Sequence, residues 1–304
     1  MTLANPAARA SVLMMASTVC FAAMAIAIRM AADTLHAFEI AFFRSFFGLI
    51  FALPLLLRTG TAILRTRRLN LYLLRCVIGV CAMLTGFWAL VHMPLAEAIA
   101  LSYTTPLFVT IGAVLVLGEV VRIRRWSAVV VGFIGALVVL RPGVEQLSFP
   151  AVIALASAAL SASAAISIKF LSRTESSDAI VIYMVVIMTP ITLLAAIPVW
   201  TWPQGVVWFW LAATGLLGTV GHILLTRAYQ IGDVSALQPI NFLQLPIVAS
   251  LAWWLFNEQI DRWTVIGAAI IFCSTLYIAH REAVLARRVT TESGTSKESA
   301  AANR

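Results

Sequence analysis

Uncharged polar side chains occur at two places inside otherwise apolar segments, and they are suited to binding a polar ligand. Hydroxyl groups stand just before Pro106, and amide groups stand directly before Pro239 and between Pro239 and Pro246. The amides recur every three residues, which places them on one helical face. Such a lining suits a small metabolite with several hydrogen-bonding groups; hydrogen bonding between helices is the alternative. The predicted substrate-binding residues are Ser102, Tyr103, Thr105, Gln238, Asn241 and Gln244, with Trp88 as a stacking platform whose commoner role would be packing.

Arg44 is the one charge placed well inside a predicted apolar segment. Charges there must face protein or a cavity, because lipid cannot solvate them. We expect a salt bridge to a nearby acid in preference to direct binding of a substrate carboxylate. Glu39 and Glu97 are the candidate partners, although Glu39 lies five residues away and does not share a helical face. His222 is a candidate for proton coupling, and simple hydrogen bonding is the commoner alternative.

The composition identifies a membrane protein. Of the 304 residues, 62% are hydrophobic and only 11% are charged, and the mean hydropathy is +0.97. A soluble domain carries about 25% charged residues. The four cysteines fall in apolar segments without metal-ligand spacing, so neither a metal nor a cofactor is expected. The first apolar run, 10–28, exceeds the roughly 7–15 residues of a signal sequence and is expected to remain as a span.

Ten apolar segments approach the ~20 residues that cross a bilayer. With the N-terminus in the cytoplasm, seventeen Lys and Arg residues lie inside and three outside. We therefore predict a multi-pass protein of a bacterial-type inner (plasma) membrane, with both termini cytoplasmic. The basic loops are short, and their charge is explained by the orientation of the chain in the membrane. Lipid is therefore an expected partner, and nucleic acid is not. The predicted spans are about 10–30, 38–57, 71–91, 95–117, 127–140, 150–170, 179–200, 207–228, 235–256 and 263–280.

The two halves of the chain repeat one another. Ala89 and Ala228 lie 139 positions apart, as do Glu119 and Glu258, and Pro106 and Pro246 lie 140 apart. Five spans per copy is an odd number, so the second copy must enter from the opposite face. The predicted fold is an all-α membrane protein of ten transmembrane helices in a 5+5 inverted repeat. Its parts are an N-terminus (1–9), two repeats (10–141 and 150–280) and a disordered cytoplasmic tail (281–304). The glutamates and prolines are interpreted as structural anchors, each glutamate holding the helix that follows it.

These motifs resemble a known group. The pattern A-L-x4-L-A-E-A, then Pro106, then L-G-E, and the segments FEIAFFR and VGFIGALVVLRPG are similar to the drug/metabolite transporter superfamily of the EamA type. The resemblance covers about residues 10–280. It implies a ten-helix basket whose cavity is lined mainly by spans 1, 3, 4, 6, 8 and 9, and it leaves the substrate open. The second copy departs from the pattern at Asn257, where a glycine is usual, and Met184 stands at the counterpart of Arg44.

The resulting prediction is a secondary transporter that moves a small polar metabolite by alternating access. Export of an amino acid or a related compound is the main interpretation. Uptake of a cofactor-like metabolite, such as S-adenosylmethionine or riboflavin, is the alternative, and a non-transporting scaffold is a third. An enzyme is not expected, because H-E-x-x-H, G-x-S-x-G and Walker motifs are absent from the sequence. A proton or substrate gradient would drive transport, and a homodimer is compatible with the sequence.

Overall fold

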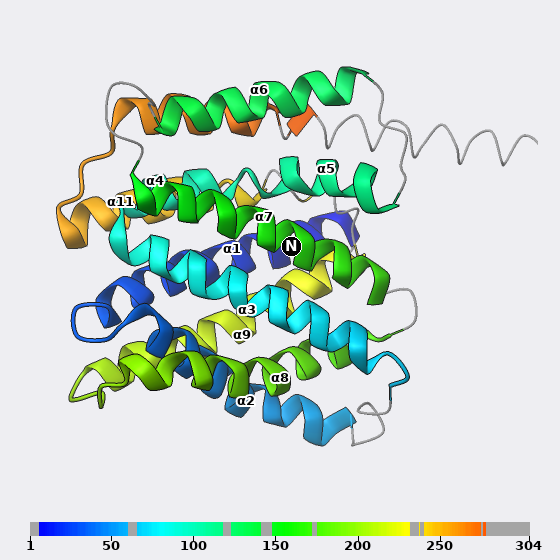
Figure 1. Ribbon diagram of the computed structural model, residues 1–304, viewed down its shortest axis with the longest axis vertical. Helices are drawn as coiled ribbons and strands as arrows, with labels where there is room; N and C mark the ends of the chain where they lie inside the picture. The colour runs from blue at the N-terminus through cyan, green and yellow to red at the C-terminus, as the bar shows by residue number, and fades with distance from the viewer. Residues whose placement is uncertain are drawn as a thin grey trace, which may run out of the picture.

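The computed structural model describes residues 6–59, 66–117, 123–140, 148–171, 175–231, 237, 240–274 and 276–277. Within these ranges the chain is helical and contains no strand (Figure 1). The elements are α1 (Pro6–Ala31), α2 (Ala37–Thr59), α3 (Leu69–His92), α4 (Leu95–Ser102), α5 (Thr105–Leu117), α6 (Ile123–Leu140), α7 (Phe149–Leu171), α8 (Ser177–Ala196), the 3-10 turn η2 (Ile197–Val199), α9 (Val207–Ile231) and α11 (Gln244–Phe256). A further apolar helix covers Arg262–Ser274.

The helices account for the ten predicted spans. Seven stretches are long and apolar enough to cross a membrane, and three shorter apolar helices accompany them. Large apolar side chains remain exposed on the outside, such as Leu57 at 77% and Leu115 at 78%. In lipid this exposure carries no hydrophobic penalty, which explains why the sequence holds more apolar residues than its core can bury.

The fourth and ninth spans are each broken near their middle, which differs from the continuous helices expected. Residues 103–104 form a turn between α4 and α5, and residues 242–243 form the equivalent turn before α11. In both turns an amide N–H bonds to the carbonyl three residues earlier, Thr104 to Leu101 and Leu243 to Ile240. Pro106 and Pro246 follow two and three residues after these turns, and a proline has no N–H to continue the helical ladder. Non-helical backbone at membrane depth is tolerated only inside protein or along a cavity.

The inverted repeat is visible in the path of the chain. In Figure 1, α1 runs from right to left, whereas its repeat equivalent α7 runs from left to right. The first helix of each half also packs mainly on a helix of the other half. The most extensive contact of α1 is with α9 of the second half, and α7 packs in the same way on α3, the equivalent of α9 in the first half. The pseudo-twofold relation predicted from the sequence is therefore confirmed.

Glycines allow the closest helix crossings. A Cβ added to Gly215 on α9 would clash with the Phe47 Cβ and would lie 3.0 Å from the Gly48 backbone nitrogen on α2. Gly135 on α6 and Gly267 on the last helix approach each other's carbonyl oxygens in the same way, at 2.9 and 2.6 Å from the added Cβ. Such small-residue crossings let helices pack on each other in lipid, where the hydrophobic effect does not hold them together.

Candidate substrate cavity

A cavity of about 480 Å³ lies between the two halves. Its walls come from α1, α3 and α4 of the first half and α7, α9 and α11 of the second, as the family resemblance implies. Spans 2 and 7 also contribute, through Arg44 on α2 and through Met184 and Met188 on α8. The volume falls within the range of about 300–1,000 Å³ typical of pockets for small molecules.

Small side chains on two facing helices make the space. On α3 the lining residues Gly79, Ala82 and Gly86 recur at intervals of three and four, which is one helical face. On α7 the same spacing brings Ser157, Ser161 and neighbouring alanines to the wall. Because these side chains are short, α3 and α7 can pack closely and still leave a void between them. The Ser157 hydroxyl donates to the Ala82 carbonyl at 2.8 Å, which ties the two helices together beside the cavity.

The predicted substrate-binding residues divide into those at the cavity and those elsewhere. Ser102 and Gln244 line it. Thr105 is not among the lining residues, and its hydroxyl donates to the Ser102 carbonyl. Trp88 also lies outside the lining and stacks on His92, with ring centroids 4.0 Å apart. Because Trp88 falls between the positions of the small-residue face of α3, its ring points to a different side from the cavity. Gln238 lies outside the described residues.

Tyr103 and Asn241 join the two broken spans. The Tyr103 hydroxyl donates to the Asn241 carbonyl oxygen at 3.1 Å, and the Tyr103 and Phe242 rings lie 4.2 Å apart. Tyr103 is 7% exposed. The structure thus brings the hydroxyl group of Tyr103 in one copy against the backbone carbonyl of Asn241 in the other, and not against its side-chain amide. The contact joins two interruptions of helical structure, so it fits the alternative of bonding between helices. The turn at residues 242–243 also interrupts the helix on which the continuous amide stripe was expected.

The expected salt bridge of Arg44 is not formed. Among the described residues the salt bridge present is Arg29 with Glu258. Glu39 is fully buried at the start of α2, where its carboxylate accepts hydrogen bonds from the backbone N–H groups of His36 at 2.9 Å and Thr201 at 2.6 Å. Because these bonds satisfy the Glu39 carboxylate as a helix cap, it does not require a salt bridge with Arg44. Glu97 occupies the first turn of α4, where the helix dipole favours an acid.

Arg44 faces the cavity, together with a second arginine that sequence reasoning missed. The seventeen Lys and Arg residues that the sequence places on the cytoplasmic side include Arg75, but Arg75 is the seventh residue of α3 and is 7% exposed. Both guanidinium groups line the cavity, and so does His222. The ring of His222 also makes an edge contact with Phe21, with centroids 5.1 Å apart. The signal for Arg75 was available, since the predicted span 71–91 already contained it.

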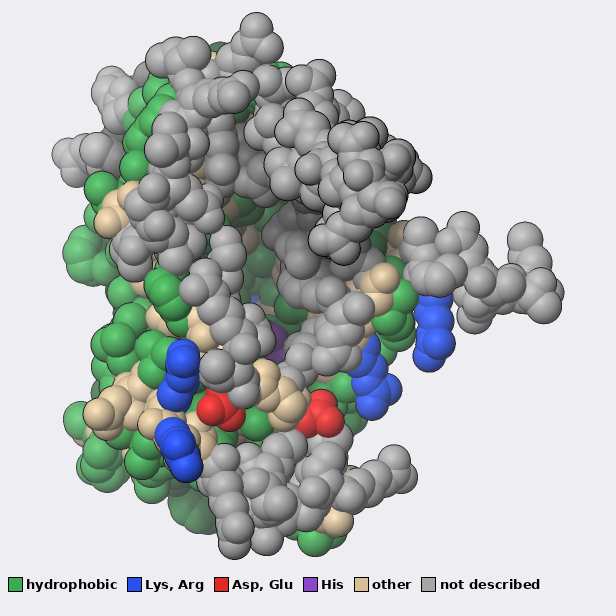
Figure 2. All heavy atoms as spheres, turned by 90° about the vertical axis from the view of Figure 1, so that its right-hand side faces the viewer, with side chains coloured by type: hydrophobic (Ala, Val, Ile, Leu, Met, Phe, Trp, Pro, Cys, Tyr) green, Lys and Arg blue, Asp and Glu red, His purple; other side chains and the backbone are tan. Residues whose placement is uncertain are grey.

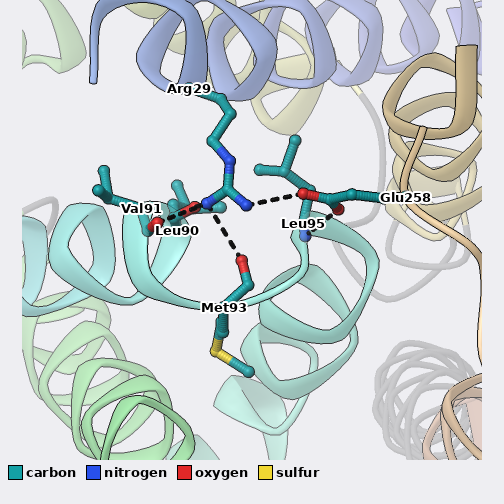
Figure 3. Close-up of polar contacts among 6 residues, drawn as sticks. All are labelled: Arg29, Leu90, Val91, Met93, Leu95 and Glu258. Carbon is teal, nitrogen blue, oxygen red and sulfur yellow. Dashed lines mark hydrogen bonds and ion pairs between the residues drawn. The ribbon is translucent and has the colours of Figure 1, made fainter. Parts of the chain in front are cut away.

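One end of the bundle is closed by a charged cluster (Figure 3). Arg29, near the end of α1, donates to the Glu258 carboxylate at 2.7 Å and to the carbonyl oxygens of Leu90, Val91 and Met93. The other carboxylate oxygen of Glu258 accepts from the Leu95 N–H at 2.9 Å. Glu258 therefore anchors α1 and the start of α4 in the other repeat, and the expectation that it holds the following helix is wrong. Its repeat equivalent Glu119 lies outside the described residues.

The opposite end is hollowed. Figure 2 faces the end where α1 and α3 begin, and it shows a depression at the centre, with Lys and Arg side chains gathered near it. Arg9, Arg67, Arg68 and Arg227 are exposed basic residues of the described chain that the sequence assigns to the cytoplasmic side. The Arg29–Glu258 cluster thus closes one end of the molecule, called the stapled end below, and the opposite end is the hollow end (Figure 2).

Inverted halves, broken spans and a cavity between them define the class of secondary transporters. The chain belongs to the EamA-like transporter family, which matches residues 8–141 and 148–279. The resemblance seen in the sequence motifs is therefore confirmed, and the protein is a multi-pass membrane transporter.

Relatives with assigned functions cover most of the chain. It is 34% identical over 227 residues to a riboflavin transporter of Vibrio cholerae, across 74% of this chain and 76% of the relative. It is 35% identical over 253 residues to an S-adenosylmethionine uptake transporter of Rickettsia prowazekii, across 82% and 84%. It is 31% identical over 267 residues to a pseudopaline exporter of Pseudomonas aeruginosa, across 85% and 92%.

The fold is similar to that of a solved crystal structure. The TM-score is 0.65 at 17% identity, and the likeness covers 92% of this chain and 98% of the other. At this identity the likeness concerns the fold alone.

Proposed function

We propose that this chain is an inner-membrane uptake transporter for a cofactor-like polar metabolite. The supporting observation is the cavity between the repeats, whose volume of about 480 Å³ suits a ligand larger than a free amino acid. The names of the relatives agree with this choice, since they include riboflavin transport and S-adenosylmethionine uptake. The cavity wall also carries both apolar groups, such as Phe87, and hydrogen-bonding groups, such as Ser161 and Gln244.

The proposed mechanism is alternating access. In the described conformation the Arg29–Glu258 cluster closes one end, while the other end is hollow (Figure 2). Rocking of one five-helix copy against the other would break the cluster and reverse the access. A proton or substrate gradient would supply the driving force. From the distribution of basic residues we propose that the hollow end faces the cytoplasm, with both termini on that side. A reporter fused after Arg304 should then be active only in the cytoplasm.

Export of a small metabolite such as an amino acid is the second candidate function. It is the main expectation from the sequence, and the relationship to a pseudopaline exporter favours it. The two directions differ in a measurable way, because each predicts net movement of metabolite in the opposite sense across energised vesicles.

The test is transport by the full chain in proteoliposomes. Vesicles would be incubated with labelled riboflavin, labelled S-adenosylmethionine and a mixture of labelled amino acids, and the trapped label would be counted. We expect accumulation of a cofactor-like compound and none of the amino acids. Movement of the amino acids alone would favour the export candidate, and vesicles that move nothing would contradict both.

A pair of serine variants on α7 tests whether the cavity is the route. Ser161 lines the cavity, so Ser161→Phe fills it and should abolish transport. Ser163 lies two residues away with an exposed side chain outside the lining, and its hydroxyl bonds only within its own helix, to Ala159. Ser163→Phe adds the same bulk and should transport normally. Equal activity in both variants would place the route elsewhere.

A further inference from the structure

Two buried arginines face the cavity without an acidic partner among the described residues. Arg44 and Arg75 are 8% and 7% exposed, and both line the wall. Among the described residues, their guanidinium groups donate to thioether sulfurs: Met83 for Arg44 at 3.6 Å, and Met184 and Met188 for Arg75 at 3.3 and 3.9 Å. The Nε of Arg75 is buried and has no hydrogen-bond partner in the described part of the chain.

This arrangement is costly for the empty protein. A thioether is a weak acceptor and carries no charge, so it cannot replace the water that a guanidinium loses on burial. A buried charge is normally paired, and the Arg29–Glu258 cluster shows that this chain can build such a pair. The described residues that line the cavity include no Asp or Glu. Arg44 and Arg75 also line the same cavity, where two positive charges repel one another.

We propose that Arg44 and Arg75 together form a binding site for an anionic group of the transported molecule, a carboxylate or a phosphate. This inference rests on the proposed transport function and specifies its substrate as an organic anion or a zwitterion with an anionic group. An anion placed between the two guanidinium groups removes their mutual repulsion and satisfies the free Nε. A guanidinium binds carboxylate and phosphate oxygens through two parallel N–H groups, which a thioether neighbour leaves available.

The methionines fit this role as replaceable neighbours. Methionine is flexible and adapts to irregular space, so Met83, Met184 and Met188 can occupy the guanidinium faces in the empty state and withdraw when the anion arrives. Gly218 and Gly79 leave room beside the two arginines. A Cβ added to Gly218 would lie 3.1 Å from the Arg44 Nε, and one added to Gly79 would lie 3.7 Å from an Nη of Arg75.

The binding test uses the full chain in phosphatidylcholine nanodiscs, which offer no net anionic headgroup. Its thermal midpoint is measured with succinate, with inorganic phosphate and with succinamide, the uncharged counterpart of succinate, at constant ionic strength. We expect succinate, phosphate or both to raise the midpoint and succinamide to leave it unchanged. A response to succinate or to phosphate alone identifies the anionic group. Equal shifts with succinate and succinamide, or no shift with either anion, would overturn the proposal.

Charge-matched variants locate the site. Arg44→Gln and Arg75→Gln should each weaken the apparent anion affinity at least about thirtyfold, as expected when one partner of a buried charge pair is truncated. Arg227→Gln removes the same charge from an exposed position on α9 outside the lining and should retain the wild-type affinity. Arg75→Lys keeps the charge and should retain part of the response. Midpoints measured without ligand report folding. A folded Arg75→Gln protein with undiminished affinity would refute the assignment.

Failure of this inference differs from failure of the proposed function. If vesicles transport riboflavin, an uncharged molecule, and the arginine variants transport it equally well, the function stands and the anion site is refuted. If succinate or phosphate binds through Arg44 and Arg75 while vesicles move no labelled compound, the site stands and the proposed uptake function is refuted.

Discussion

At the scale of single residues, Arg75 of α3, which has no acidic partner among the described residues, allows a stability prediction. Arg75→Met should raise the thermal midpoint of the ligand-free protein, by the equivalent of about 1–2 kcal/mol, because replacing poorly satisfied buried charge with apolar groups of similar size is often stabilising. The surrounding Met184 and Met188 already form an apolar neighbourhood for the new side chain. The measurement is thermal unfolding in detergent, followed by intrinsic tryptophan fluorescence.

The matched variant is Arg29→Met, which removes an arginine that does have partners. It should lower the midpoint, because Glu258 would be left half-buried without its cation. A lower midpoint for Arg75→Met as well would mean that Arg75 stabilises the fold, which would remove the basis for a site held ready for an anion.

Residue roles were predicted less well than residue types. The sequence identified polar residues in spans, and of these Ser102 and Gln244 reach the cavity. The sequence does not reveal which way Trp88 points. The face of α3 that borders the cavity is defined by Gly79, Ala82 and Gly86, and the same spacing of small residues also occurs in ordinary helix packing. The sequence predicts an acidic partner for Arg44, because a buried charge without a partner is costly. The observed arrangement becomes favourable only when a ligand supplies the missing negative charge.

At the scale of helices, the crossing of α2 and α9 depends on a glycine. Gly215→Ala should destabilise the protein by about 1–3 kcal/mol, the usual cost of forcing extra atoms into a packed interior, since the added methyl group meets the Phe47 Cβ and the Gly48 backbone. Gly79→Ala is the control, because its Cβ would find only ordinary contacts at 3.7 Å or more and alanine favours a helix. Thermal unfolding of both variants decides the point; equal midpoints would show that the crossing can relax.

The spans themselves were predictable, and their interruptions were not. The apolar helical runs follow from the bilayer, in which backbone polar groups must be hydrogen-bonded within the protein. The turns at residues 103–104 and 242–243 arise where proline removes a hydrogen bond and the other repeat offers a partner, as Tyr103 does for the Asn241 carbonyl. That partner lies in the other half of the chain, so neither copy alone encodes the turn.

At the scale of the whole molecule, the two halves meet at the Arg29–Glu258 cluster, and its strength should set the balance between the two access states. Glu258 carries one hydrogen bond from α1 and one from α4, so it connects elements of the first repeat to the end of α11 in the second. Hydrogen bonds to charged groups contribute about 1.5–3 kcal/mol. Because the cluster would have to break for that end to open, this contribution favours the state in which the end is closed.

Glu258→Gln should therefore shift the population toward opening at that end by about tenfold, which corresponds to about 1.4 kcal/mol. Spin labels at the exposed positions Thr34 and Gln259 report the stapled end, and labels at the exposed positions Arg67 and Arg227 report the hollow end. Double electron–electron resonance in nanodiscs should show a longer distance for the first pair and a shorter one for the second.

The control is Asp33→Asn, which neutralises an exposed acid at the same end without touching the cluster. Lengthening of the first distance alone would indicate local fraying of α11, whereas opposite changes at the two ends are the signature of rocking halves.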